Sequence, residues 1–137
     1  MANTLQELPV YLKAREFHVA VAAIIARPAF GRNRKLHEQI ADANESILAN
    51  MEEGFEQSTD RGLEKYLFDA KGSTAEVVTR LNAAYRKHYI THDELVERTR
   101  LGEELGRMLG GWIKYLARSG WTDRGRHGVE QSRTRRP

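Results

Sequence analysis

Cysteine is absent from the 137-residue chain, proline occurs three times, and aromatic residues make up 8% of it. The absence of cysteine excludes disulfides, zinc–thiolate sites, iron–sulfur clusters and a cysteine nucleophile. It is also typical of a reducing compartment, so we expect a cytoplasmic protein. No apolar run approaches the ~20 residues that span a bilayer. The first residues carry no basic side chain of the kind that opens a signal peptide.

Most of the chain carries no net charge. The sequence has 22 basic and 19 acidic side chains, a formal net charge of +3. Residues 1–122 contain 17 of each, so the whole excess lies in residues 123–137. The body therefore has no strong global field that attracts a polyanion. We expect residues 1–121 to form one domain, and residues 122–137 to be a disordered, arginine-rich tail.

No segment alternates polar and apolar residues for long enough to form a strand, whereas four segments repeat apolar residues with the helical period. Pro9 suits a first helical turn and Pro28 a helix end. Thr91 followed by Glu94 is typical of a capping box. The pattern predicts helices over residues 8–27, 34–56, 60–88 and 92–118. Short connections indicate antiparallel neighbours, and therefore an all-α, up-down-up-down four-helix bundle.

Motifs for catalysis and metal binding are also lacking. No glutamate is followed by histidine three residues later, which excludes the Glu-x-x-His pairs of di-metal bundles. Phosphate-binding loops, dinucleotide fingerprints and nucleophile elbows are missing from the sequence. We therefore expect a protein that is not an enzyme, with no catalytic residue, cofactor or metal site.

Basic side chains recur on the fourth predicted helix and in the tail. Arg100, Arg107, Lys114 and Arg118 share one helical face, and Arg98 lies on the same helix. Glu103 and Glu104 partly offset their charge. The other candidate contacts for phosphate are the tail arginines, Arg124, Arg126, Arg133, Arg135 and Arg136. The alternative interpretation is a solvated helix face and a solvated tail.

Glycines within the predicted helices need a reason, because each costs ~1 kcal/mol relative to alanine. Gly102, Gly106 and Gly110 form a ridge without side chains, and Gly72-Ser73 makes a similar notch. The ridge serves either packing inside the bundle or a contact between subunits. Apolar residues beside the main stripes favour a subunit contact, since one bundle of this size would not bury them all: Tyr11, Ile25, Phe55, Phe68 and Tyr85.

Polar residues lie on or next to the predicted inward faces, where burial costs free energy unless they are paired. They are Gln39, Asn50, Glu53 and Glu76. A mutual network that fixes helix register is one interpretation, and a binding role is the other.

One family shares several of these residues. The run Ser46-Ile47-Leu48-Ala49-Asn50-Met51-Glu52-Glu53-Gly54, then Tyr66-Leu67, Ala70, Gly72-Ser73, Glu76 and Leu81, resembles the 23S rRNA intervening-sequence protein family. The closing run is similar to the same family and to the related accessory variability protein of diversity-generating retroelements: Glu104-Leu105-Gly106-Arg107-Met108-Leu109-Gly110-Gly111-Trp112-Ile113.

The resemblance implies a bacterial four-helix bundle without enzymatic activity, assembled into a homo-oligomer that is typically a pentamer. Some members bind nucleic acid through a basic surface, and retroelement members bind a reverse transcriptase. The matched positions that would make the family's polar contacts are Gln39, Asn50, Glu53, Ser73 and Glu76.

The chain departs from the family at Ala41-Asp42, where two arginines are usual. We therefore expect any nucleic-acid binding by the body to be weak. The leading hypothesis is a non-catalytic oligomeric binding module for RNA, DNA or a reverse transcriptase. The alternative is a protein-only scaffold or assembly factor with no nucleic-acid role.

Overall fold

The computed structural model describes residues 4–118, and all regular structure in that range is helical. The long helices are α1 (Pro9–Ile25), α2 (Arg34–Phe55), α3 (Asp60–Arg86) and α4 (His92–Arg118). Two short 3₁₀ helices precede α1 and α2, η1 (Leu5–Glu7) and η2 (Pro28–Arg32). The expected all-α fold with four helices and no strand is therefore confirmed for the described residues. The predicted disordered tail and its five arginines lie outside them.

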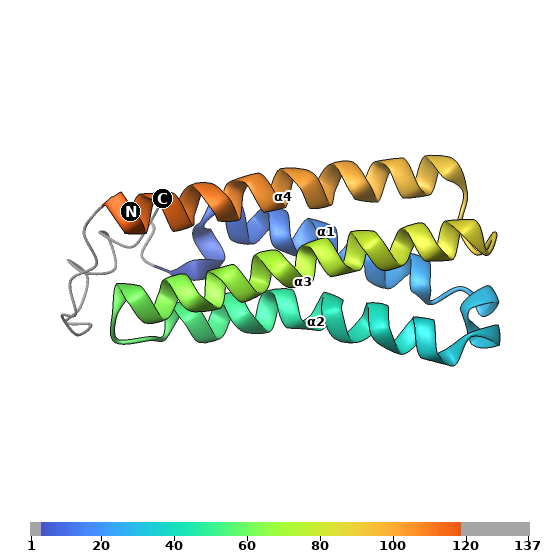
Figure 1. Ribbon diagram of the computed structural model, residues 1–137, viewed down its shortest axis with the longest axis horizontal. Helices are drawn as coiled ribbons and strands as arrows, with labels where there is room; N and C mark the ends of the chain where they lie inside the picture. The colour runs from blue at the N-terminus through green and yellow to red at the C-terminus, as the bar shows by residue number, and fades with distance from the viewer. Residues whose placement is uncertain (1–3, 119–137) are drawn as a thin grey trace.

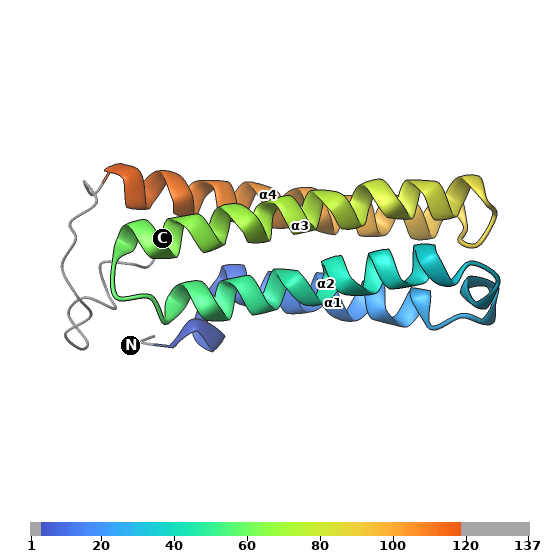
Figure 2. The ribbon, with the colours of Figure 1, turned by 60° about the horizontal axis from the view of Figure 1, so that its bottom comes forward.

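The four helices lie side by side along one long axis (Figures 1 and 2). The connection that contains η2 and the α3–α4 connection are at one end, and the α2–α3 connection is at the other (Figure 1). Two segments far apart in the sequence thus meet at the same end of the molecule.

Side-chain caps fix where the helices begin. The Asn33 side chain accepts a hydrogen bond from the Leu36 amide at 3.1 Å, and Thr59 Oγ1 accepts one from the Gly62 amide at 3.0 Å. At α4, the Glu94 amide donates to Thr91 Oγ1 at 3.2 Å, so the predicted capping box is present. These caps satisfy amides that have no partner within the helix.

Two helices end earlier than the sequence predicts. The predicted helix over residues 8–27 ends at Ile25, because Arg27 takes an extended conformation before Pro28. The predicted helix over residues 60–88 ends at Arg86, because His88 adopts a φ of 66°. That left-handed conformation closes the end of α3, where the Tyr89 amide donates to the Ala84 carbonyl at 3.0 Å.

The core lies along one face of each long helix. On α2, Met51 is fully buried and Asn50 is half-buried. On α3, Thr74 is buried and Ser73 is half-buried. On α4, Leu101 and Gly102 are both buried. Contact with two neighbouring helices widens the buried face beyond a single row of residues.

The expected surplus of apolar side chains is present but falls partly on other residues than those named from the sequence, since Leu12, Val19 and Val96 are also exposed. Tyr11, Ile25 and Phe55 are all buried within the bundle, while Phe68 is 61% exposed and Tyr85 36% exposed. Tyr11 Oη donates to Glu52 Oε2 at 2.7 Å, and burial together with this hydrogen bond raises the pKa of Tyr11 to about 12. Of the five side chains named as a reason for subunit contact, two remain available.

Candidate nucleic-acid interface

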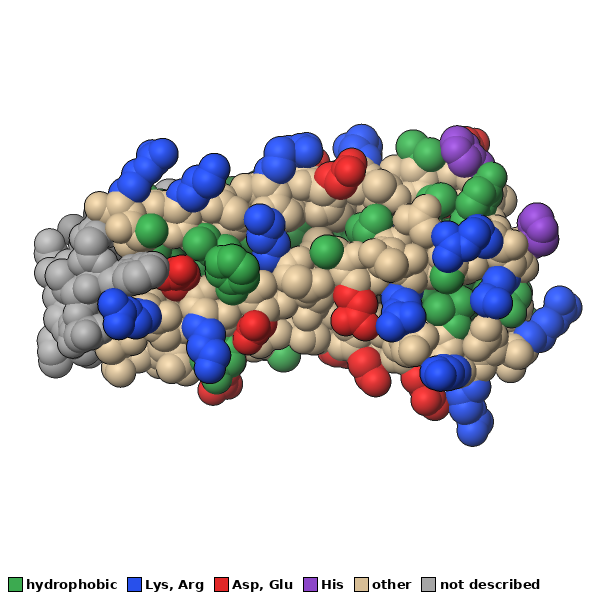
Figure 3. Space-filling view, in the orientation of Figure 1, with side chains coloured by type: hydrophobic (Ala, Val, Ile, Leu, Met, Phe, Trp, Pro, Cys, Tyr) green, Lys and Arg blue, Asp and Glu red, His purple; other side chains and the backbone are tan. Residues whose placement is uncertain are grey.

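Four basic side chains of α4 form an exposed stripe. Arg100, Arg107, Lys114 and Arg118 recur at intervals of seven, seven and four residues, and all are exposed. They cover ~27 Å along the helix. Within residues 4–118, none of these four side chains makes an ion pair. Figure 3 shows Lys and Arg side chains along the edge of the molecule that α4 forms. We call these four residues the α4 stripe.

Glu103 and Glu104, the acidic residues next to the α4 stripe, point in different directions. Glu104 pairs with Lys13 of α1, at 3.4 Å between Oε1 and Nζ. Lys13 also binds Glu16 at 2.9 Å, and the pKa of Lys13 is raised chiefly by that hydrogen bond. Glu103 is exposed on the side of the α4 stripe that faces α3, which is the side opposite to Glu104. One of the two expected offsetting charges is therefore neutralised elsewhere.

Arg98 does not belong to this stripe. Its Nε donates to the Ala20 carbonyl of α1 at 3.0 Å, and its Nη1 lies 3.4 Å from the Glu94 carbonyl. The side chain is partly buried between α1 and α4. Arg98 thus ties two helices together, and the suggestion from the sequence that it lies on a basic surface is not supported.

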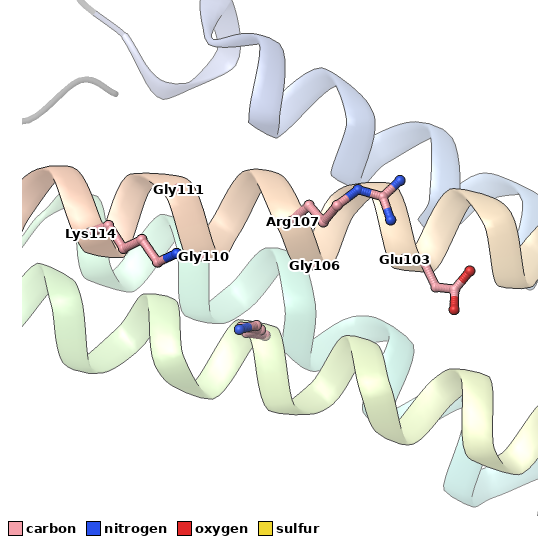
Figure 4. A pocket seen from close by; sticks show the side chains of 7 residues that line it. Glu103, Gly106, Arg107, Gly110, Gly111 and Lys114 are labelled. Carbon is pink, nitrogen blue, oxygen red and sulfur yellow. The ribbon is translucent and has the colours of Figure 1, made fainter.

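A groove runs beside the α4 stripe, between α3 and α4. One part is a cleft of about 510 Å³ lined by Lys71, Glu103, Gly106, Arg107, Gly110, Gly111 and Lys114. Figure 4 shows Arg107 and Lys114 projecting from the segment of α4 that carries the three glycines. An adjoining part, of about 320 Å³, includes Thr74, Ala75 and Val78. The groove has a floor of small residues and three cations on its borders.

The glycines of the ridge differ in their surroundings, so neither packing inside the bundle nor a contact between subunits explains all of them. A Cβ on Gly102 would lie 2.7 Å from Val78 Cγ2 and 3.2 Å from the Phe17 ring, so this glycine serves packing inside the bundle. A Cβ on Gly106, Gly111 or Gly72 would meet no atom within 4 Å. A Cβ on Gly110 would lie 3.4 Å from Lys71 Nζ. Of the three ridge glycines, Gly102 is therefore an internal contact, Gly110 lies beside Lys71, and Gly106 has open space at the position of a Cβ.

The polar positions of the family resemblance are only partly brought together. Asn50 Nδ2 donates to Ser46 Oγ at 2.8 Å, and Ser73 Oγ donates to the same oxygen at 2.9 Å. This chain of hydrogen bonds joins α2 to α3. Its centre, Ser46, was not predicted from the sequence to make a polar contact.

The remaining three polar positions lie apart from that chain of hydrogen bonds. Gln39 is half-buried on α2, and Glu53 is exposed. Glu76 is exposed and forms a long ion pair with Arg80, at 3.8 Å. Within residues 4–118, no hydrogen bond links Gln39, Glu53 or Glu76 to Asn50 or Ser73.

A buried polar pair joins α1 to α2 where the sequence predicted none. Asn44 is 2% exposed, and its Nδ2 donates to the His18 carbonyl at 3.0 Å. His18 Nδ1 lies 3.3 Å from the Asn44 carbonyl oxygen, and its Nε2 lies 3.5 Å from Glu45 Oε1. Asn44 directly follows Ala43, which recurs with the helical period of the apolar residues Leu36, Ile40 and Ile47, and this neighbour was its only signal in the sequence. The pair fixes how α1 and α2 lie against each other.

The described part of the chain contains no arrangement of three His, Asp or Glu side chains that could hold a metal ion. Among residues 4–118, no helix is both long and apolar enough to cross a membrane.

Comparisons with known proteins agree with the family resemblance. Residues 6–111 match a protein family described as 23S rRNA-intervening sequence protein. A solved structure of similar fold is a protein of unknown function from the S23 ribosomal protein family of Bacteroides thetaiotaomicron. The two chains are 23% identical, the TM-score is 0.69, and the similarity covers 77% of this chain and 98% of the other. The search of curated proteins found no match.

Proposed function

Since the chain belongs to the 23S rRNA-intervening sequence protein family, we propose that it is a non-catalytic, homo-oligomeric binding module for nucleic acid. The observation that carries this proposal is the α4 stripe, four exposed cations without ion-pair partners in the described residues. Cations of this kind bind phosphate, because each contact releases counterions from the nucleic acid. The family name points to RNA as the first probe.

The binding that we propose is weak, sensitive to salt and independent of sequence. Arg and Lys side chains on an exposed helix reach phosphates, whereas sequence is read by contacts with base edges. Asp42 is exposed on α2 where the family usually has an arginine, which lowers the positive charge of the body further. Four phosphate contacts on a single strand correspond to a slope of about −2.8 in log K against log salt concentration.

The assembly that we propose is a ring of up-down-up-down bundles in the cytoplasm, with five protomers as the family resemblance implies. The open groove between α3 and α4 supports a contact with a second copy, because its glycine floor allows close approach of a helix. Repetition of the α4 stripe would then raise affinity through effective concentration. The arginines of residues 122–137 would add to the same electrostatic attraction.

The decisive experiment compares two double variants of equal charge. Arg107→Gln/Lys114→Gln removes two cations of the α4 stripe, and Arg15→Gln/Lys65→Gln removes two exposed cations from α1 and α3. Fluorescence anisotropy with single-stranded RNA of about 20 nucleotides measures Kd between about 50 and 200 mM salt. We expect the first pair to weaken binding several-fold more than the second. Equal affinities of the two variants, or tight binding at high salt, would contradict the proposal.

A protein-only scaffold is the second candidate, and one observation favours it. Arg107 and Lys114 border the same groove that we propose as the contact between copies, so a tight interface would cover part of the stripe. A reverse transcriptase is the protein partner that the retroelement resemblance suggests for such a scaffold. A stable oligomer that binds no RNA even at low salt would support this candidate.

A further inference from the structure

A second group of cations lies at one end of the bundle, away from the α3–α4 groove. Arg32, Arg34 and Lys35 come from η2 and the start of α2, and Arg86 and Lys87 come from the end of α3. All five side chains are exposed. Figure 1 places both segments at the same end, and Figure 3 shows Lys and Arg side chains gathered there. We call these five residues the loop-end cluster.

Two contacts hold the two segments of this cluster together. The Phe30 ring of η2 is fully buried and lies 5.3 Å from the Tyr89 ring, centroid to centroid. The Arg27 guanidinium forms a bidentate pair with the Glu94 carboxylate at the start of α4. Cations more than 50 residues apart in the sequence are thus presented on one fixed surface.

The charge of this surface is not balanced by its neighbours. In the described part of the chain, the five side chains of the loop-end cluster form no ion pair. Glu94 is engaged by Arg27, and the other exposed acids in the first turns of α2 and α4 are Glu38, Asp42, Asp93 and Glu97. At the opposite end of the bundle, the acids Glu52, Glu53, Glu56, Asp60 and Glu64 are accompanied by the bases Arg61, Lys65, Lys114 and Arg118. The positive charge of the loop-end cluster is therefore local, within a body that is neutral in sum.

The surface is also hollowed. A cleft of about 510 Å³ lies between the end of α1, η2 and the start of α2, and its lining includes Arg34, His37 and Glu38. Gly31 forms part of the same wall and has no atom within 4 Å of the position of a Cβ. A flexible polyanion can therefore approach the backbone closely beside the cluster.

We propose that the loop-end cluster is a second binding surface for the phosphate backbone of single-stranded nucleic acid. A positively charged groove that tracks phosphates is the usual device of proteins that bind single strands without sequence preference. None of the five residues lines the groove between α3 and α4. The surface is therefore accessible whether or not a second copy covers that groove, and it does not depend on the α4 stripe.

The test neutralises one lysine from each segment. Lys35→Gln/Lys87→Gln is compared with the control Arg15→Gln/Lys65→Gln, which changes the net charge equally but outside both basic surfaces. The probe is the same labelled single-stranded RNA of about 20 nucleotides, in the full-length protein. We expect a several-fold higher Kd for the cluster variant than for the control, and a salt slope less steep by about 1.4. Circular dichroism melting establishes that both variants are folded.

Lysine footprinting gives a second measurement that does not depend on a variant. Acylation of the wild-type protein followed by mass spectrometry should show that RNA protects Lys35 and Lys87 but leaves Lys65 reactive. Equal reactivity with and without RNA, or a cluster variant that binds like the control, would overturn the inference. If only Arg107→Gln/Lys114→Gln then weakened binding, the α4 stripe would stand and the loop-end cluster would fail. The reverse result would retain the cluster and reject the stripe.

Discussion

Glu94 is the residue whose ionisation contributes most plainly to the fold. Its carboxylate accepts a hydrogen bond from the Thr91 amide at 2.8 Å and pairs with Arg27. The hydrogen bond from Arg27, with those from Thr91, lowers the pKa of Glu94 to about 2. The unfolded chain has the ordinary value near 4.5. The ionised form therefore stabilises the native state above pH 4.5, and this contribution is lost as the pH falls toward 2.

Glu94→Ala should accordingly lower the free energy of unfolding at pH 7 by roughly 1 kcal/mol, because the Thr91 amide loses the carboxylate that accepts its hydrogen bond. The pair with the exposed Arg27 adds little, because solvent screens it. Urea denaturation at pH 7 and near pH 2 measures the difference from wild type, which should shrink at the lower pH. Glu97→Ala is the control, since it removes an exposed carboxyl one turn further along α4. A difference that is the same at both pH values would contradict the assignment.

For individual residues, the sequence predicted the contacts between residues that are close together in the chain. The capping box at Thr91 follows from residues three apart, which any α-helix brings together. Arg27 lies 67 residues from Glu94, and no local rule selects it among the other arginines. The left-handed His88 was missed for a related reason, since glycine or asparagine is the usual signal for that conformation.

Within α4, glycines that look alike in the sequence have different surroundings. Gly102 is buried against Phe17 and Val78, whereas Gly111 is exposed with no neighbour at the position of a Cβ. Gly102→Ala should lower stability by about 1–3 kcal/mol, because the added methyl overpacks the core. Gly111→Ala should raise it by up to ~1 kcal/mol, because alanine favours the helix. Thermal unfolding of the two variants measures both changes in melting temperature, which should have opposite signs. Two shifts of the same sign would refute this account.

Helix positions were therefore more predictable than helix contacts. The period of the apolar residues placed α2 and α4 within one residue of their observed bounds. It could not tell whether a given glycine would face Val78 or solvent, since that depends on how α3 and α4 are turned toward each other. The same uncertainty explains why Tyr11 and Phe55 were named as candidates for a contact between subunits and are buried within the bundle.

For the molecule as a whole, the groove between α3 and α4 provides a test of self-association. We expect light scattering at micromolar concentration to return a multiple of the 15.7 kDa chain mass. Gly106→Leu should reduce that mass without loss of helicity, because the side chain enters open space in the protomer and fills the groove. Gly31→Leu is the control, since it adds the same side chain at an open position outside the groove. A monomer mass for the wild type would exclude the oligomer.

Charge distribution, rather than net charge, decides how the whole molecule would meet a polyanion. The excess of +3 lies in residues 123–137, yet most of the exposed cations without ion-pair partners in the described part lie on the α4 stripe and the loop-end cluster. The α4 face could be predicted because its members follow one helical period. The loop-end cluster could not, because η2 and the end of α3 are brought together only by the fold.

Truncation after Gly120 separates the contribution of the tail from that of the body. It removes five arginines and two acids, a change of −3 in net charge per chain. Affinity for single-stranded RNA should fall by a similar factor for unrelated sequences, because binding to phosphates carries no sequence information. The salt slope should also become less steep, by about 0.7 for each phosphate of a single strand that the tail no longer neutralises. Anisotropy titrations with two RNAs of different sequence measure both effects, and a weakening confined to one RNA would show that the tail recognises bases.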